Sequence, residues 1–182
     1  MAIDLFGTCQ APSLGGIKRL KIATRGTDEL PLVFPLDIEL KTNDESIIML
    51  SDDEDNRTIT LGSQQIQYRL VMPFHATLEE EETTTRQGRY YTQKLDFEIS
   101  KLNLTTINQL KAFLFTDGGE FSISNAMCLI EDMNGVLWIC GYMQPLVLEE
   151  FEMDTGTTEG DNKYTLSYTC KTYARIRQVE LK

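Results

Sequence analysis

Histidine is almost absent from this 182-residue sequence, which contains only His75. A lone histidine is more often a packed or surface residue than a general base or a metal ligand. The four cysteines show no Cys-x-x-Cys spacing, and three of them fall in predicted strands: Cys9, Cys128, Cys140 and Cys170. We therefore expect thiols that fill space in a core, not a structural metal site.

Long apolar runs are also missing. No stretch approaches the roughly 20 apolar residues that a membrane-spanning helix needs. Met1–Leu20 lacks the basic start and apolar centre of a signal peptide. Hydrophobic residues make up 41% of the chain, which is enough to bury a core of its own. The sequence therefore predicts a single domain that folds in the cytosol and has no membrane partner.

Positive charge is scarce, since 17 lysines and arginines face 28 aspartates and glutamates, for a net charge of -11. Duplex binding requires lysine and arginine to neutralise phosphates, so this balance argues against a protein that holds nucleic acid. The same balance suits a channel through which DNA slides, because a negative wall keeps phosphates from adhering to it.

Two short motifs match known sites but lack residues that the chemistry requires. Asp154–Gly156 matches the aspartic-protease triplet, yet too little chain follows to supply the second carboxylate in a matching loop. Asp53 and Asp55 have calcium-loop spacing, but Arg57 is cationic and Thr58 occupies the glycine position. We predict no catalytic, cofactor-binding or metal-binding residues, and hence no enzyme.

Alternation of apolar and polar residues predicts β-strands over most of the chain. In the segment 92–101, Leu95, Phe97 and Ile99 share one face and leave the polar residues on the other. The same pattern predicts strands over 17–24, 32–40, 66–72 and 164–174, and a further strand is predicted over 147–154. Asn134-Gly135 supplies the positive backbone angles of a tight turn, so 127–131 and 136–142 are predicted to form a hairpin.

One helix and two loops complete the predicted fold. Ile107, Leu110 and Leu114 are spaced to share the apolar stripe of a short amphipathic helix after strand 92–101. Two acidic segments, 51–57 and 79–88, are predicted to be exposed loops. The expected fold class is mainly β, a sandwich or barrel of antiparallel strands with one flanking α-helix, in a single domain over 17–182.

Sheet edges are the main problem of such a fold, because an open edge exposes unpaired backbone donors and acceptors. Copies of one chain that add edge strands to one another head to tail would cover those edges in a closed ring. Aromatic residues are the interface candidates by residue type: Tyr90, Tyr91, Phe121, Trp138, Tyr142 and Phe151. The alternative for each of them is ordinary core packing.

Several segments, in order along the chain, resemble tail tube proteins of tailed bacteriophages. They are Cys9–Lys18, the strand Gln93–Ile99 that leads into the helix, the Asp132–Gly135 turn, and Thr155–Thr157 with Asp161–Thr165. The resemblance implies a tail-tube-like fold in which several subunits, usually six, build an inner β-barrel. It also implies stacked rings that line the channel for DNA ejection, and residence in the virion after assembly in the host bacterial cytoplasm.

The resemblance also implies particular contacts. Family members use an extended N-terminal arm and a long loop or hairpin to contact the ring above or below, and 1–16 and 79–88 match these roles by position and composition. The expected partners are copies of the chain, neighbouring tail or connector proteins, and DNA that passes without specific binding. The acidic middle segments leave open whether the ring repeats in a tube, is a single head-to-tail connector, or lies at the tail tip.

The channel wall is expected to carry the polar faces of two strands. The lumen-facing candidates are Lys94, Asp96 and Glu98 on one strand, and Glu150, Glu152 and Asp154 on another. Two other functions stay open at this point. One is a monomeric, lipocalin-like barrel with an apolar ligand cavity, and the other is an enzyme, for which the chain shows no cluster of titratable groups.

Overall fold

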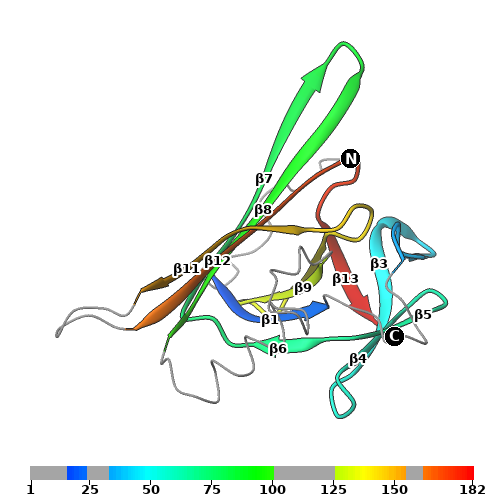
Figure 1. Ribbon diagram of the computed structural model, residues 1–182. Coiled ribbons are helices and arrows are strands. Elements are labelled where there is room, and N and C mark those ends of the chain that lie inside the picture. The colour runs from blue at the N-terminus through cyan, green and yellow to red at the C-terminus, as the bar shows by residue number, and fades with distance from the viewer. Residues whose placement is uncertain (1–15, 24–32, 101–125, 155–161) are drawn as a thin grey trace, which may run out of the picture.

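The fold is seen in a computed structural model that describes residues 16–23, 33–100, 126–154 and 162–182. The predicted helix with its stripe of Ile107, Leu110 and Leu114 lies outside the described residues, as do most of the N-terminal arm, Cys9 and Phe121. Within the described part the chain is mainly β, as predicted, and forms two sheets (Figure 1).

Nine strands form the larger sheet. They are β1 (Ile17–Ala23), β2 (Glu39–Lys41), β3 (Asp44–Asp53), β4 (Thr58–Leu61), β5 (Gln64–Gln67), β6 (Arg69–Val71), β9 (Met127–Asp132), β10 (Leu137–Cys140) and β13 (Arg177–Leu181). The strand order is β5-β4-β3-β13-β10-β9-β1-β6, with β2 added beside β3. All pairs are antiparallel except β13 with β3.

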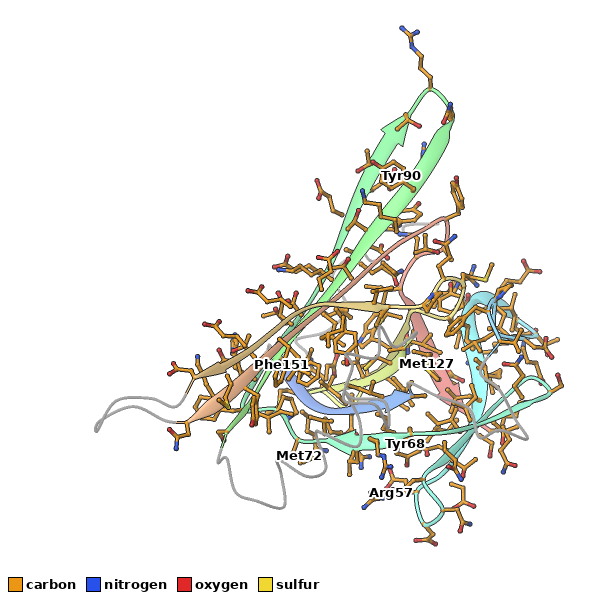
Figure 2. All side chains as sticks on the ribbon, in the orientation of Figure 1. Arg57, Tyr68, Met72, Tyr90, Met127 and Phe151 are labelled. Atoms are coloured by element: carbon orange, nitrogen blue, oxygen red, sulfur yellow. The ribbon has the colours of Figure 1, made fainter. Side chains whose placement is uncertain are left out.

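The larger sheet curls into a nearly closed barrel. Its two ends, β5 and β6, are consecutive along the chain and are separated only by Tyr68, so the end of the sheet returns to its beginning. The pairing of the barrel wall is interrupted at Tyr68, between β5 and β6. There the backbone N–H of Tyr68 donates to the carbonyl of Arg57, in the β3–β4 turn, at 3.0 Å. Figure 2 shows Tyr68 and Arg57 in this part of the barrel.

Four strands form the smaller, antiparallel sheet: β7 (His75–Thr85), β8 (Gly88–Ser100), β11 (Val147–Asp154) and β12 (Lys163–Thr172). Their order is β11-β12-β8-β7. The β7–β8 hairpin extends well beyond the rest of the molecule, and Tyr90 lies on the projecting part (Figures 1 and 2). One face of this sheet packs against the barrel.

Three barrel strands are buried on both faces. On β9, Met127 and Leu129 point into the barrel and belong to its core, whereas Cys128 and Ile130 belong to the core shared with the smaller sheet. Strands β1 and β10 likewise contribute side chains to both cores. A fully buried side chain of this size stabilises the fold by about 1.5–3 kcal/mol, so the two cores hold both sheets together.

Several predicted elements are confirmed. The alternating segments gave β1, β8, β11 and β12, and the 127–142 hairpin is present as β9 and β10. Its turn is closed by Asp132, whose carboxylate accepts the backbone N–H groups of Asn134 and Val136 at 2.8 and 2.9 Å. Gly135 has φ of 80°, as the Asn-Gly turn requires. The three described cysteines are buried and free.

Other predictions were wrong. The acidic segment 79–88 is not a loop, because Glu79–Thr85 belong to β7 and each pairs with a residue of β8. In the segment 51–57, only residues after Asp53 form a turn. Strand 32–40 is reduced to its end in β2, and strand 66–72 is interrupted at Tyr68. Strands β3, β4 and β13 and the first half of β5 were not predicted.

Candidate functional site

The two predicted triplets of polar residues lie on one face of the smaller sheet. Strand β12 lies between β8 and β11, so paired residues of neighbouring strands form rows that run across the sheet. One row runs Glu150, Ser167, Asp96, Thr77, and the next runs Glu152, Thr165, Glu98, His75. The row between them on the opposite face is Phe151, Leu166, Phe97, Ala76, which packs in the core. We call the polar side the acidic face.

Two of the lysines on the acidic face are paired with its carboxylates. Lys94 Nζ lies 2.9 Å from Asp96 Oδ2, and Lys163 Nζ lies 2.7 Å from Glu98 Oε1. These hydrogen bonds raise the pKa of both lysines, so both lysines stay protonated at neutral pH. Carboxylates still outnumber lysines on this face, because edge strand β11 adds Glu150, Glu152 and Asp154. The face therefore presents negative charge to solvent.

Two further carboxylates, Glu79 and Glu81, extend the acidic face along β7. They lie opposite Lys94 and Thr92 on β8, and both are exposed. Sequence reasoning missed them because it placed them in a loop. The following run Thr83–Thr85 was the available signal, since threonine favours strands.

The base of the β7–β8 hairpin is fixed to the barrel by Glu80 and Gln93, which lie opposite each other. The Glu80 carboxylate accepts from Arg175 Nε at 3.1 Å and from the Ile176 backbone at 2.5 Å. Gln93 is 1% exposed, donates to the Ala174 carbonyl at 3.0 Å, and accepts the Gly141 N–H at 3.2 Å. These bonds hold the hairpin at a set position relative to the barrel.

The predicted interface aromatics divide into core and surface residues. Tyr142 is 2% exposed and donates its hydroxyl to the Arg175 carbonyl at 3.0 Å, and Tyr91 is 9% exposed beneath the Arg175 guanidinium. Burial within one subunit favours the core alternative for both. Phe151 packs on Tyr164, with ring centroids 5.2 Å apart, and also serves the core.

Two aromatic candidates remain partly exposed. Trp138 packs against the core shared by the two sheets, and its indole N–H donates to Asp132 at 3.1 Å. Tyr90 is half-buried on the acidic-face side of the projecting hairpin, opposite Thr83. Of the five candidates that the structure describes, Tyr90 is therefore placed best for contact with another molecule.

Among the strands that the structure describes, β7 and β11 form the edges of the smaller sheet, and each pairs with one neighbour. Every adjacent pair in the sheet is antiparallel, so the two edges run in opposite directions. An edge β7 and an edge β11 from two copies therefore have the relative direction that antiparallel pairing requires.

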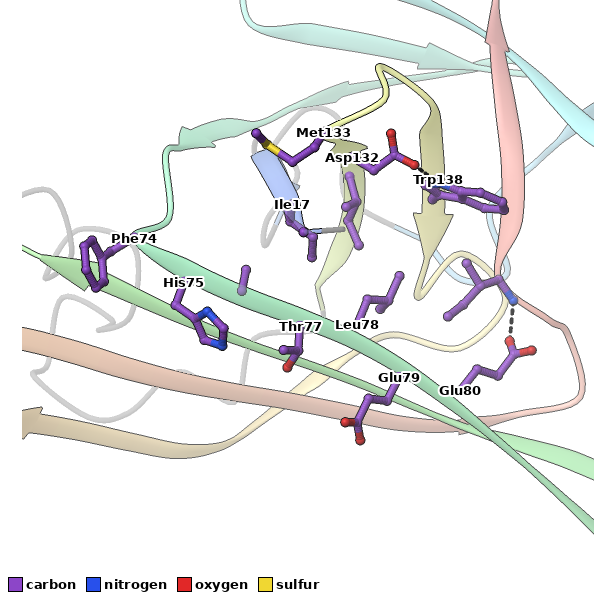
Figure 3. A pocket seen from close by; sticks show the side chains of 14 residues that line it. Ile17, Phe74, His75, Thr77, Leu78, Glu79, Glu80, Asp132, Met133 and Trp138 are labelled. Atoms are coloured by element: carbon purple, nitrogen blue, oxygen red, sulfur yellow. Dashed lines mark hydrogen bonds between the residues drawn. The ribbon is translucent and has the colours of Figure 1, made fainter. Parts of the chain in front are cut away.

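A cleft of about 850 Å³ lies between β7 and the barrel (Figure 3). Ile17, Ile130 and Trp138 line it from the barrel, and Phe74 stands at its rim, 67% exposed. Its volume is within the range of ligand pockets, roughly 300–1,000 Å³. Two of its acidic residues, Glu80 and Asp132, are hydrogen-bonded to Ile176 and Trp138 (dashed lines in Figure 3). These two carboxylates therefore stabilise the fold.

Among the described residues, no three His, Cys, Asp or Glu side chains converge in a way that would hold a metal ion. In the same part of the chain there is no helix with the length and apolar character needed to cross a membrane. His75 is exposed and lies opposite Glu98.

Comparison with known proteins gives no relative: no family model, no curated protein and no solved structure matches the chain. Function is therefore inferred from geometry, charge and the resemblance of the short motifs.

Loss of the Gln93 amide should loosen the hairpin. We expect Gln93→Leu to lower the free energy of unfolding by about 1–3 kcal/mol, because the Gly141 N–H is left buried without its acceptor. Gln65→Leu, at an exposed position of β5, is the matched control and should change it by under about 0.5 kcal/mol. Urea unfolding measures both values, and equal values would show that Gln93 does not anchor the hairpin.

Proposed function

We propose that this protein is a structural subunit of a phage virion that assembles into a hexameric ring of a tail tube or a tail-tube-like connector. The observation that carries the proposal is the smaller sheet, which combines one strongly acidic face with two outer strands of opposite direction, each paired with a single described strand. The motif resemblance to tail tube proteins adds to it. Each subunit would add its β7 to the β11 of the next.

Ring closure by this pairing would produce a wide channel. Each copy contributes four strands, and all pairs, including those between copies, would be antiparallel. A hexamer of such sheets exceeds the roughly 16 strands at which closed barrels leave an aqueous channel. The barrel domain packs on the apolar face of the sheet, so it would lie outside the channel and leave the acidic face toward the lumen.

A negative lumen would let DNA pass without specific binding. Carboxylates of the acidic face repel phosphates, and screening confines the effect to about 8 Å at physiological salt. DNA near the axis would therefore meet little resistance, and DNA near the wall would be pushed back toward the axis.

The barrel itself is a poor candidate for a lipocalin-like cavity. Its interior is filled by its own buried side chains, including Ile48, Leu50, Ile59, Leu61 and Met127. The cleft beside β7 is the alternative place for an apolar ligand in a monomer, and a dye-binding monomer is the outcome that would favour it.

Assembly should depend on salt. Glu79 and Glu81 on β7 and Glu150 and Glu152 on β11 bring like charges together when the edges pair, and this opposes association. We expect monomers in sedimentation velocity at about 0.01 M salt and rings at about 1 M, where the Debye length falls from about 30 Å to about 3 Å.

Neutral variants sharpen this test. Glu150→Gln with Glu152→Gln should move assembly to lower salt, whereas Glu45→Gln, at an exposed position of β3 in the barrel, should not. A chain that stays monomeric at every salt and concentration, neutral variant included, would contradict the proposed ring.

Reversing charge on the acidic face should slow DNA ejection. Asp96→Lys with Glu98→Lys places cations where phosphates pass, so DNA would adhere to the wall. Glu45→Lys with Asp55→Lys, both exposed on the barrel, is the matched control. Virions carrying each pair should form normally, and ejection rate should fall only for the first. Equal rates would show that Asp96 and Glu98 do not face the lumen.

A further inference from the structure

A lysine and an aspartate are buried in contact inside the barrel. Lys21 lies on β1 and Asp52 on β3, and the side chain of each is 3% exposed. Their strand neighbours are core residues, since Lys21 lies opposite Leu129 and Asp52 opposite Ile59. Strands β1 and β3 do not pair with each other, so this contact crosses the barrel interior beside the break in its wall.

Two further groups complete the arrangement. Lys21 Nζ contacts Asp52 Oδ2 and lies 2.7 Å from Glu54 Oε1. The Tyr68 hydroxyl donates to the other oxygen of Asp52 at 3.2 Å, and its ring lies 5.2 Å from Lys21 Nζ. The structure thus places the Lys21 amine against two carboxylates, those of Asp52 and Glu54. The amine and the Asp52 carboxylate lie beside the Tyr68 side chain.

The charges of this pair are costly to keep. Removing an ammonium and a carboxylate from water carries a penalty that their attraction often fails to offset. Burial lowers the pKa of Lys21, but hydrogen bonds to Asp52 and Glu54 outweigh it and raise that pKa, so the ammonium is the resting form. Transfer of its proton to Asp52 gives a neutral amine and a neutral acid, and the burial of both side chains, each 3% exposed, favours these neutral forms more than water does.

We propose that the folded protein joins Lys21 and Asp52 by an intramolecular isopeptide bond. After the proton transfer, the Lys21 amine attacks Asp52 Cγ and the new C–N bond forms. Nζ then loses a second proton and the Cγ–OH bond breaks, so that one amide and one water result. The step is a condensation and needs no oxidant, reductant or cofactor.

Glu54 is the residue placed to carry the second proton. Its carboxylate touches the reacting nitrogen, and the hydrogen bond with Lys21 lowers the pKa of Glu54, so Glu54 is ionised, which is the form that can take up a proton. Arg19 Nη2 holds the same oxygen at 3.0 Å. Glu54 takes the proton from Nζ and gives it to the departing hydroxyl, while Tyr68 steadies Asp52 through its other oxygen.

The bond would brace the barrel where its wall is weakest. The sheet is interrupted at Tyr68, between the strands that pair with β1 and with β4. A covalent link from β1 to β3 spans this interruption and prevents the two sides from separating. Such a brace suits a subunit that has to keep its shape under load.

Mass spectrometry under denaturing conditions tests the proposal directly, because denaturation separates an ion pair but not an amide. The purified full-length protein should have the sequence mass less one water, and a tryptic digest should contain a branched peptide that joins Lys21 and Asp52. Lys21→Arg keeps the positive charge but should show the full mass. Lys41→Arg, in the half-exposed ion pair with Glu180, is the control and should lose water like the natural chain.

Glu54→Gln tests the proton carrier, and it should show the full mass after purification. Complete water loss in this variant would overturn the role of Glu54. Full mass in the natural protein after prolonged incubation of the folded chain, with separate Lys21 and Asp52 peptides, would overturn the isopeptide bond itself. That measurement needs no variant to fold.

Discussion

Burial of β1, β9 and β10 on both faces is the constraint on which the rest of the molecule depends. A barrel wall commonly turns one face to water, yet Cys128, Ile130 and Cys140 on the outer side of this wall are 0–1% exposed. A second apolar surface has to cover them, and the smaller sheet supplies it. Its other face carries the carboxylates, and its two outer strands, β7 and β11, each pair with only one of the described strands.

Charge is therefore distributed in two different ways. Carboxylates such as Glu150 and Glu152 stand on the solvent side, where they contribute little to stability but set the field of the acidic face. The Lys21–Asp52 pair has the opposite position, inside a barrel core where ionic groups are costly. The first arrangement suits a surface that repels a polyanion, and the second suits a covalent link that removes both charges.

The sequence predicts the elements whose signal is local. Strands β8 and β12 alternate clearly, and Asn134-Gly135 marks the turn of the hairpin between β9 and β10. Most of strand β7 was not predicted because Glu79–Thr85 has no alternation of apolar and polar residues. Its strand conformation comes from pairing with β8. Residue type cannot tell whether Tyr142 is core or interface, since that depends on which surfaces meet. The common face of the two triplets likewise depends on β12, a non-local neighbour.

A cryo-electron microscopy map of the protein assembled at high salt is the most direct test of the central claim. The account predicts a closed ring in which β7 of each subunit pairs with β11 of the next, with Asp96, Glu98, Glu150 and Glu152 on the inner wall and the barrels outside. A ring joined through the barrels, or one with the acidic face on its outer surface, would contradict it.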